Sequence, residues 1–415
     1  MNVVAERNAT SAAAALRTPD AVRERATELL QKGERDQLEN FCLHLDRLDA
    51  AADYVVDDIR TNYPDLSIPC HSRWRHFGAG GIDRAALLDA ALGDASSAER
   101  ARARIDLTVV SVLLDAGAGG QWRFREPGTD GLYSRSEGLA VASFHMFLNG
   151  ALSSRKSAKL IADAGGLEEL DNDKLMRAFQ VSDANPLVGI DGRVELMNAL
   201  GRTLRARPEV FGQTLPRIGN LYDYFVERAK GGTVSARNVL VTVLDSFSGI
   251  WPGRIELGGE NLGDVWRHPA IHRDDVTNGL MPLHKLSQWL TYSLVEPLGW
   301  AGMRVTGLNA LTGLAEYRNG GLFIDLGVLE LRDSSKMNRV HDVGTELVVE
   351  WRALTVALLD RLAPLIRRRL GLDEETLPLA KILEGGTWSA GRRVAAEKRA
   401  DGEPPLRVKS DGTVF

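Results

Sequence analysis

The spacing of apolar side chains along the chain predicts a mainly helical protein. Leucine, valine and alanine recur at three- and four-residue intervals, which places them on one face of a helix. The first clear helix should start at the N-cap Thr18, with Pro19 at the first helical position, and end at Gly33. Further helices are expected over 38–59, 98–114, 136–148, 194–205, 221–230, 236–247, 283–295 and 346–370.

Evidence for strands is sparse in this sequence. Only 303–306 and the tail 406–415, which contains an Asp411–Gly412 turn signal, have strand character. Internal repeats and low-complexity linkers are absent from the sequence, so domain boundaries are weakly marked. We expect a helical N-terminal region over 1–105, with a basic loop at 70–77, and a larger helical core over 106–415.

Composition and charge narrow the class of protein. The 415 residues carry 51 Lys and Arg against 56 Asp and Glu, and a net charge of −5 argues against a nucleic-acid partner. The two cysteines cannot build a disulfide framework or a four-thiolate metal site. Apolar runs stay shorter than the roughly 18 residues of a membrane span, and the first residues lack the leucine-rich segment of a secretory signal. We therefore expect a cytoplasmic protein with no membrane partner.

The segment 70–77 concentrates groups that bind anions. It consists of Cys70, His71, Ser72, Arg73, Trp74, Arg75, His76 and Phe77. Its two arginines and two histidines suit a phosphate or carboxylate, which a guanidinium holds through forked hydrogen bonds. A metal site built from the cysteine and the histidines matches no familiar zinc spacing. The remaining alternative is a surface loop around a buried Trp74.

Two further segments carry candidate polar side chains. Ser134 or Ser136 can cap the helix predicted to follow them, and its N-terminal N–H groups would suit a phosphate. Capping does not explain Arg135, which is a candidate anion ligand. On another predicted helix, Lys285 shares a face with Gln288 at three-residue spacing, although a helix rich in leucine and tryptophan usually belongs to the core.

A third segment, 315–322, places a carboxylate, a phenol, a guanidinium and an amide before two glycines. Glu316 is the candidate acid or base, because partial burial would raise its pKa towards the working range. An ion pair between Glu316 and Arg318 that stabilises a turn explains the same residues more simply.

The nucleophile elbow, the paired-histidine zinc motif and the dinucleotide fingerprint are absent from the sequence, so serine hydrolases, zinc proteases and dinucleotide enzymes are disfavoured.

At these residues the chain resembles the uracil-catabolism protein family, fungal and bacterial proteins found with a ring-opening route of pyrimidine breakdown. The resemblance runs over nearly the whole chain, and so many blocks in one order are highly specific. The blocks are His71–Phe77, 111–117, 135–140, 316–321, 385–392 and the ending 410–415.

From about residue 106 onward the chain is also similar to the queuosine-nucleotide N-glycosylases of queuine salvage. These are mainly helical relatives of the helix-hairpin-helix DNA glycosylases, and the resemblance implies that fold here, with little β structure. Their Asp-Tyr-Arg block corresponds to Glu316, Tyr317 and Arg318. Two of their helical motifs correspond to 285–288 and 350–353. Glutamate here replaces their aspartate, and the proline that follows their arginine is lost, so a different substrate is expected.

Together the two resemblances imply hydrolysis of an N-glycosidic bond in a small ribosyl compound. The substrate that fits the ring-opening route is ribosylurea or its 5′-phosphate, which would yield urea and ribose or ribose 5-phosphate. Glu316 becomes the preferred catalytic carboxylate, because it stands at the position of the glycosylases' aspartate. A carboxylate near the sugar would stabilise the oxocarbenium-like transition state. Neither a metal nor an organic cofactor is required.

The implied site residues fall into a catalytic pair and a substrate-binding set. Glu316 and Tyr317 form the pair. The binding set consists of His71, Arg73, Arg75, His76, Arg135, Lys285, Gln288, Arg318 and Trp388. Two alternative functions stay open: an N-glycosylase acting on another modified nucleotide, and a non-catalytic partner of the ring-opening enzyme, for which replacement of Glu316 by glutamine should be silent.

Overall fold

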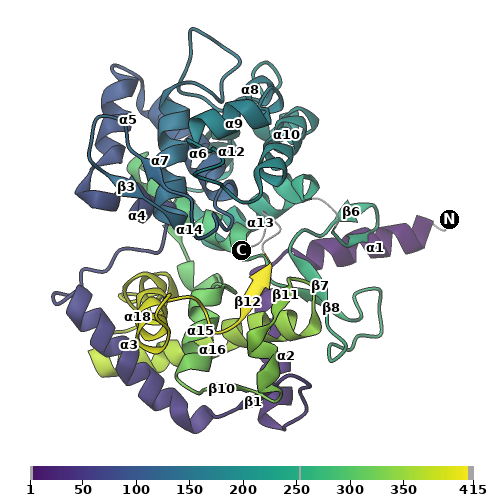
Figure 1. The fold of residues 1–415 in the computed structure, drawn as a ribbon. Helices are drawn as coiled ribbons and strands as arrows, with labels where there is room; N and C mark the ends of the chain where they lie inside the picture. The colour runs from purple at the N-terminus through teal and green to yellow at the C-terminus, as the bar shows by residue number, and fades with distance from the viewer. Residues whose placement is uncertain (1–2, 252–253, 410–415) are drawn as a thin grey trace. The chain divides into compact units, whose positions relative to one another are not determined.

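The computed structural model describes residues 3–251 and 254–409, and it is mainly helical (Figure 1). Helices account for 57% of it and strands for 9%, which confirms the predicted class. The helices expected from the sequence are present as α2 (Pro19–Glu34), α6 (Ser97–Leu113), α7 (Arg135–Leu148), α10 (Ile190–Ala206), α12 (Leu221–Arg228), α13 (Ala236–Phe247), α14 (Lys285–Trp300) and α16 (Glu346–Leu370). Thr18 caps α2 as predicted, because its side chain accepts the Ala21 N–H at 3.2 Å.

The predicted helix over 38–59 starts too early. Residues Phe41–Leu43 form strand β1, a short 3-10 turn follows, and helix α3 (Leu48–Asn62) begins only afterwards. Strand β1 pairs antiparallel with β10 (Leu329–Leu331), and the Glu350 carboxylate accepts the Phe41 N–H at 3.0 Å. Partners nearly 300 residues away thus override a locally helical pattern of apolar residues.

The described chain divides into two compact units, each assembled from separate segments. Unit 1 contains 3–71, 254–288 and 307–409, and unit 2 contains 72–251 and 289–306. The division expected near residue 105 falls within α6, a continuous helix of unit 2. Residues 285–288 and 289–300 of helix α14 belong to different units.

The core of unit 1 surrounds helix α16, which packs against α2, α3 and α15 (Tyr317–Asp325). Helix α18 (Trp388–Lys398) lies against α15 (Figure 1). Glycines permit this close packing: a Cβ at Gly391 would lie 2.4 Å from the carbonyl oxygen of Arg318. The remaining helices of unit 1 are α1 (Val3–Leu16) and α17 (Leu379–Ile382).

The strands of unit 1 form two-stranded sheets. Besides β1 and β10, they are β5 (Glu256–Leu257), β6 (Glu260–Asn261), β7 (Val265–Arg267), β8 (Leu280–Pro282), β11 (Val340–Asp342) and β12 (Arg407–Lys409). Strand β12, which pairs parallel with β11, confirms the start of the strand predicted at 406–415. The predicted Asp411–Gly412 turn and the family block at 410–415 lie outside the described residues.

Unit 2 is a helical unit with two small sheets. Its other helices are α4 (Arg73–Phe77), α5 (Arg84–Leu92), α8 (Ala164–Glu168), α9 (Asn172–Ala178) and α11 (Pro208–Phe211). Its strands are β2 (Phe124–Arg125), β3 (Leu132–Tyr133), β4 (Thr233–Ser235) and β9 (Arg304–Thr306). Strand β9 confirms the prediction for 303–306, and it pairs parallel with β4. None of the helices within the described residues is long and apolar enough to cross a membrane.

Candidate functional site

Glu316 is the N-cap of helix α15. Its carboxylate accepts the backbone N–H groups of Arg318 at 2.7 Å and Asn319 at 2.5 Å. The side chain is buried, with 7% of the residue exposed. Burial raises the pKa of the carboxyl above its ordinary value, although the two N–H groups and the charges of Lys285 and Arg318 oppose that rise. The helix dipole adds a further interaction that favours the anion at this end of α15.

The alternative ion pair between Glu316 and Arg318 is not formed within the described part of the chain. The guanidinium of Arg318 donates to the carbonyl oxygen of Gly402 at 2.8 Å and lies 5.2 Å from the centre of the Tyr317 ring. The contact between the two residues runs instead through the backbone N–H of Arg318. Glu316 therefore acts structurally as a helix cap rather than as half of a turn ion pair.

A buried ion pair holds the segment that leads into Glu316. The two terminal nitrogens of Arg352 lie 2.8 and 2.7 Å from the carboxylate oxygens of Asp264. The third nitrogen, Nε, donates to the carbonyl oxygen of Ala315 at 3.0 Å. Burial alone would raise the pKa of Asp264, but Arg352 and the N–H donors around the carboxylate hold it well below its ordinary value. The pair is thus ionised, and it fixes the residue directly before Glu316.

The same carboxylate anchors the first turn of α14. The backbone N–H of Lys285 donates to Asp264 at 2.9 Å. The preceding residue, His284, has a φ of 47°, a left-handed conformation that is rare for residues other than glycine. Its Nε2 lies 3.0 Å from the carbonyl oxygen of Leu16, and burial lowers the pKa of this imidazole. Asp264 therefore links the two helix starts that carry Lys285 and Glu316.

Two buried amide side chains of unit 1 have polar atoms without a partner in the described structure. Gln288 accepts the Thr312 N–H at 3.4 Å through its oxygen, whereas its Nε2 donates to no described residue. Asn319 donates to the carbonyl oxygen of Leu314 at 3.4 Å, and its Oδ1 accepts no hydrogen bond within the same residues. A buried amide group left unpaired costs about 1–3 kcal/mol, so both atoms are suited to a polar ligand.

His71 and Trp388 also come together in unit 1. The ring centres of the two residues lie 5.8 Å apart. Nδ1 of His71 lies 2.6 Å from a carboxylate oxygen of Glu384, and the backbone N–H of His71 donates to the carbonyl oxygen of Ala380 at 2.8 Å. The imidazole therefore has a fixed orientation beside the start of α18.

Arg73, in unit 2, is completely buried. Its Nη1 lies 3.0 Å from the Asp115 carboxylate, and its Nε donates to Ser111 at 2.6 Å. The guanidinium also lies 5.6 Å from the centre of the Trp289 ring. These contacts describe a structural ion pair, and within the described residues only Nη2 is left without a partner for the predicted anion.

The other predicted ligands of unit 2 are Arg75, His76 and Arg135. Arg75 pairs with the carboxylate of Glu296, and His76 packs edge-on against Trp289 with 5.7 Å between ring centres. Arg135 is the first residue of α7 and has a φ of 53°, so its backbone is strained. Ser134 occupies the N-cap position of that helix without a side-chain capping bond, contrary to the expected cap. The binding roles of these residues stay predictions.

One trio of possible metal ligands occurs among the described residues, and its geometry does not suit a metal. Ligand atoms of His268, Glu346 and Glu350 lie within 4.8 Å of one another. The backbone N–H of Ala270 donates to Nδ1 of His268 at 3.2 Å, so this nitrogen carries the lone pair. Nε2, 3.3 Å from Glu350, must then carry the proton. The imidazole as described has no lone pair left for an ion.

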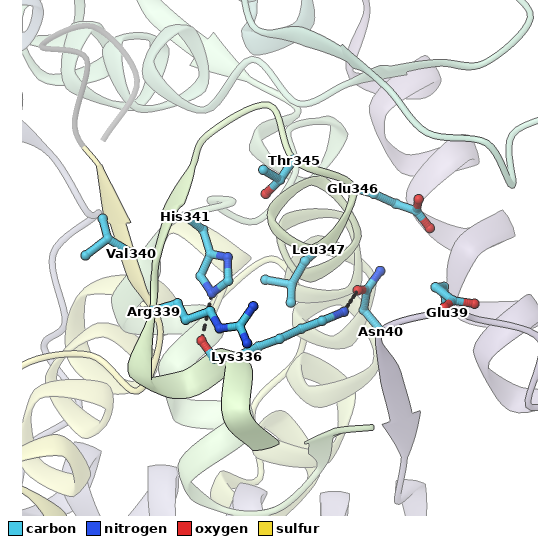
Figure 2. A pocket seen from close by; sticks show the side chains of 9 residues that line it. All are labelled: Glu39, Asn40, Lys336, Arg339, Val340, His341, Thr345, Glu346 and Leu347. Carbon is cyan, nitrogen blue, oxygen red and sulfur yellow. Dashed lines mark hydrogen bonds between the residues drawn. The ribbon is translucent and has the colours of Figure 1, made fainter. Parts of the chain in front are cut away.

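A surface pocket of about 400 Å³ also lies in unit 1 (Figure 2). Figure 2 shows Lys336 reaching to Asn40, at 2.8 Å, and His341 directed at the carbonyl oxygen of Lys336, at 2.7 Å. The remaining lining residues are Glu39, Arg339, Val340, Thr345, Glu346 and Leu347. None of the site residues predicted from the sequence lines this pocket.

Three residues of these clusters were missed by sequence reasoning. Asp264 stands in a short stretch without any motif, and its partner Arg352 is 88 positions away. Glu384 directly precedes the glycine-rich block 385–392, in which the sequence indicates only Trp388 as a site residue. Asn319 lies in the segment 315–322, where the sequence indicates Glu316, Tyr317 and Arg318 instead. Only the pairing of residues distant in sequence identifies the first two.

Comparison with known sequences places the chain in a family. Residues 15–415 match a family described as "Protein of unknown function (DUF1688)". The chain is similar to "Uracil catabolism protein 4" of Lachancea kluyveri, with 39% identity over 430 residues that cover 95% of this chain and 97% of that protein. It is similar to "Protein urg3" of Schizosaccharomyces pombe, with 39% identity over 405 residues and coverage of 95% and 96%. The chain therefore belongs to the DUF1688 family.

Proposed function

We propose that this protein is a hydrolase of pyrimidine catabolism that cleaves the N-glycosidic bond of ribosylurea or ribosylurea 5′-phosphate, with Glu316 as the catalytic carboxylate. The main support is the position of Glu316, a buried carboxylate that two backbone N–H groups hold at the N-terminus of α15. The name of the Lachancea kluyveri relative, "Uracil catabolism protein 4", supports a role in uracil breakdown. The proposed fold is that of the helix-hairpin-helix DNA glycosylases.

Cleavage of an N-riboside passes through a sugar with positive charge at its anomeric carbon. A carboxylate in a site of low dielectric stabilises that charge far better than it would in water. Because burial raises the pKa of Glu316, the carboxylate is also a stronger base than an exposed glutamate, which suits it to accept a proton from the attacking water. Both roles require the ionised form, which the backbone N–H groups of α15 favour.

Polar residues of unit 1 are suited to bind a ribosyl compound. Nε2 of Gln288 and Oδ1 of Asn319 are a buried donor and a buried acceptor that suit the hydroxyls of ribose. The phenol of Tyr317, next to Glu316 in the chain, is a further hydroxyl ligand. Lys285, whose charge acts on Glu316, suits a 5′-phosphate.

Urea release from the purified protein tests the proposal. Ribosylurea and ribosylurea 5′-phosphate are supplied separately to the wild type and to Glu316→Gln, with Glu330→Gln as the matched control because that carboxylate is exposed on β10. We expect urea from one substrate, a loss of at least 10²-fold in Glu316→Gln, and wild-type rates in the control. Wild-type protein that releases no urea from either substrate contradicts the proposed reaction.

A further inference from the structure

The buried pair of His71 and Glu384 has the geometry of a catalytic imidazole with an orienting carboxylate. Nδ1 of His71 lies 2.6 Å from Oε2 of Glu384, and only 6% and 13% of the two side chains are exposed. A carboxylate accepts the proton on Nδ1, which leaves Nε2 as the nitrogen that exchanges a proton with a ligand. The hydrogen bond thus sets the orientation of the ring and keeps one proton on Nδ1.

The backbone around this pair is held in an unusual conformation. Glu384 belongs to a π-helical turn, Leu383–Thr387, between α17 and α18. Such turns insert an extra residue into a helix and often occur at functional sites. Two glycines press the turn against α3 and the segment after it, since a Cβ at Gly386 would lie 2.8 Å from Val55 and one at Gly385 2.7 Å from Ile68. Tight packing therefore fixes the position of the Glu384 carboxylate.

Contacts within unit 1 connect the pair to Glu316. His71 packs against Trp388, the first residue of α18. One turn later, Gly391 lies so close to Arg318 that a Cβ would be 2.4 Å from its carbonyl oxygen. The N–H of Arg318 is in turn bound by the Glu316 carboxylate. The π-helical turn also contacts α15 directly. The imidazole and the proposed catalytic carboxylate thus belong to one packed cluster of unit 1.

We propose that His71 is the general acid of the reaction and that Glu384 is its positioning residue. This inference rests on the proposed function, and it supplies the proton that a poor leaving group such as urea requires. His71 acts as the imidazolium, which carries one proton on Nδ1, held by Glu384, and a second on Nε2. As the bond between the anomeric carbon and the urea nitrogen breaks, its electron pair stays on nitrogen and the Nε2 proton moves there. Water forms the new carbon–oxygen bond and gives its proton to Glu316. Exchange with solvent then restores both side chains, so ribosylurea and water yield ribose and urea.

A comparison of two leaving groups tests this role. Nitrophenolate leaves without protonation, so p-nitrophenyl riboside needs the carboxylate but no general acid. We expect His71→Asn to lower kcat for ribosylurea about 10²- to 10⁴-fold, the usual contribution of general acid catalysis, and to leave nitrophenyl riboside hydrolysis within a few-fold of wild type. Asparagine retains an N–H that can donate to Glu384. Glu316→Gln should impair both substrates.

Variants of Glu384 separate positioning from folding. Glu384→Ala should selectively lower the rate with ribosylurea, and Glu384→Gln, whose amide oxygen still accepts the Nδ1 proton, should lose less. The matched controls are His341→Asn and Glu374→Ala, which change a half-buried histidine and an exposed carboxylate of the same unit. Both should behave as the wild type. Hydrolysis of the nitrophenyl substrate also reports that each variant is folded.

The outcomes distinguish this proposal from the proposed function. Equal losses with both substrates in a His71→Asn variant whose circular dichroism matches the wild type, or no loss with ribosylurea, overturn the assignment of the general acid while leaving the hydrolase intact. Failure of the wild type to release urea overturns the proposed function and, with it, the role of His71. Selective loss with ribosylurea in both His71→Asn and Glu384→Ala supports the assignment.

Discussion

The guanidinium of Arg352 binds the carboxylate of Asp264 through two hydrogen bonds of 2.8 and 2.7 Å, and its third nitrogen binds the carbonyl oxygen of Ala315. All three nitrogens of one buried side chain are therefore engaged. Because Asp264 also accepts the N–H of Lys285, this one pair sets the positions of two residues proposed to act on the substrate. A lysine at position 352 could not form this forked contact.

Asp264→Asn should strongly destabilise unit 1. The change leaves the charge of Arg352 buried without its partner, and such losses cost about 3–5 kcal/mol. The matched control is Asp360→Asn on α16, the helix that carries Arg352, where the pair with Arg23 is partly exposed and should contribute about 0–1 kcal/mol. Urea denaturation followed by circular dichroism measures both changes. Equal free-energy losses in the two variants would contradict a special role for the buried pair.

The contribution of Asp264 to stability should depend on pH in a defined direction. Its pKa in the folded protein lies below the ordinary value of 3.8, so the folded state favours the ionised carboxylate. This stability is fully present above that value and is lost as the pH falls through the lower pKa of the folded state. The difference in unfolding free energy between wild type and Asp264→Asn should therefore shrink as the pH falls below about 3.8. A difference that stays constant down to pH 2 contradicts this prediction.

Glu316→Gln should leave the protein as stable as the wild type or more stable, while activity is lost. Burial raises the pKa of Glu316 above 4.5. At neutral pH the ionised carboxylate therefore has a higher free energy in the folded protein than in the unfolded chain, which lowers the free energy of unfolding. Removing that cost should stabilise the fold by about 0.5–2 kcal/mol, as is common where function requires strain. Thermal unfolding of the wild type and of Glu316→Gln at pH 7 measures this difference in stability. A large decrease in Tm would show that the ionised cap of α15 outweighs the cost of burial.

The raised pKa of Glu316 also predicts the acid limb of the activity profile. Since the reaction needs the ionised carboxylate, kcat/KM should fall with decreasing pH at a point above 4.5, the ordinary value for glutamate. Measurement of urea release between pH 4 and 8 locates this limb. Glu316→Asp, which keeps a carboxylate but shortens the side chain, should retain an acid limb at a reduced rate, whereas a profile flat down to pH 4 would contradict the assignment.

Gly391→Ala should separate α18 from α15. The new Cβ would lie 2.4 Å from the carbonyl oxygen of Arg318, a backbone atom that cannot move aside, and overpacking of this kind costs about 1–3 kcal/mol. Gly299→Ala is the control, because a Cβ there meets nothing within 4 Å and alanine favours the helix. Thermal unfolding should show a lower Tm for Gly391→Ala alone. Similar stability of the two variants would mean that the helix contact can relax.

The helices predicted from the sequence and those found differ mainly where distant segments intervene. Helices α13 and α16 match their predicted ranges. Their apolar residues are buried in the structure, so the spacing of these residues in the sequence marks each helix correctly. The region 38–47 departs from its helical pattern, because Phe41 pairs with Leu331 and Glu350 binds the N–H groups of this segment. Periodicity reports which residues are buried, but it does not report which backbone they pair with.

In the candidate site, too, the sequence indicates individual residues, whereas the fold decides which of them interact. The sequence predicts Glu316 and Lys285 as site residues, and the structure brings them within electrostatic range of each other. The alternative ion pair with Arg318 is not formed among the described residues: the carboxylate accepts backbone N–H groups of α15, and the guanidinium of Arg318 donates to Gly402. Arg73 was chosen for its charge, which the fold uses in a buried pair with Asp115. A residue's charge is visible in the sequence, whereas its partner depends on the fold.

The sequence by itself determined the helical class, most helix positions and the family, because each depends on residue spacing and on blocks of neighbouring residues. The tertiary structure alone decided that Asp264 joins Arg352, that Glu384 orients His71 and that Glu316 caps α15. The first two pairings join residues 88 and 313 positions apart, and the cap depends on where α15 begins. Such contacts follow from the packing of whole elements, since burial makes an unpaired charge too costly to tolerate.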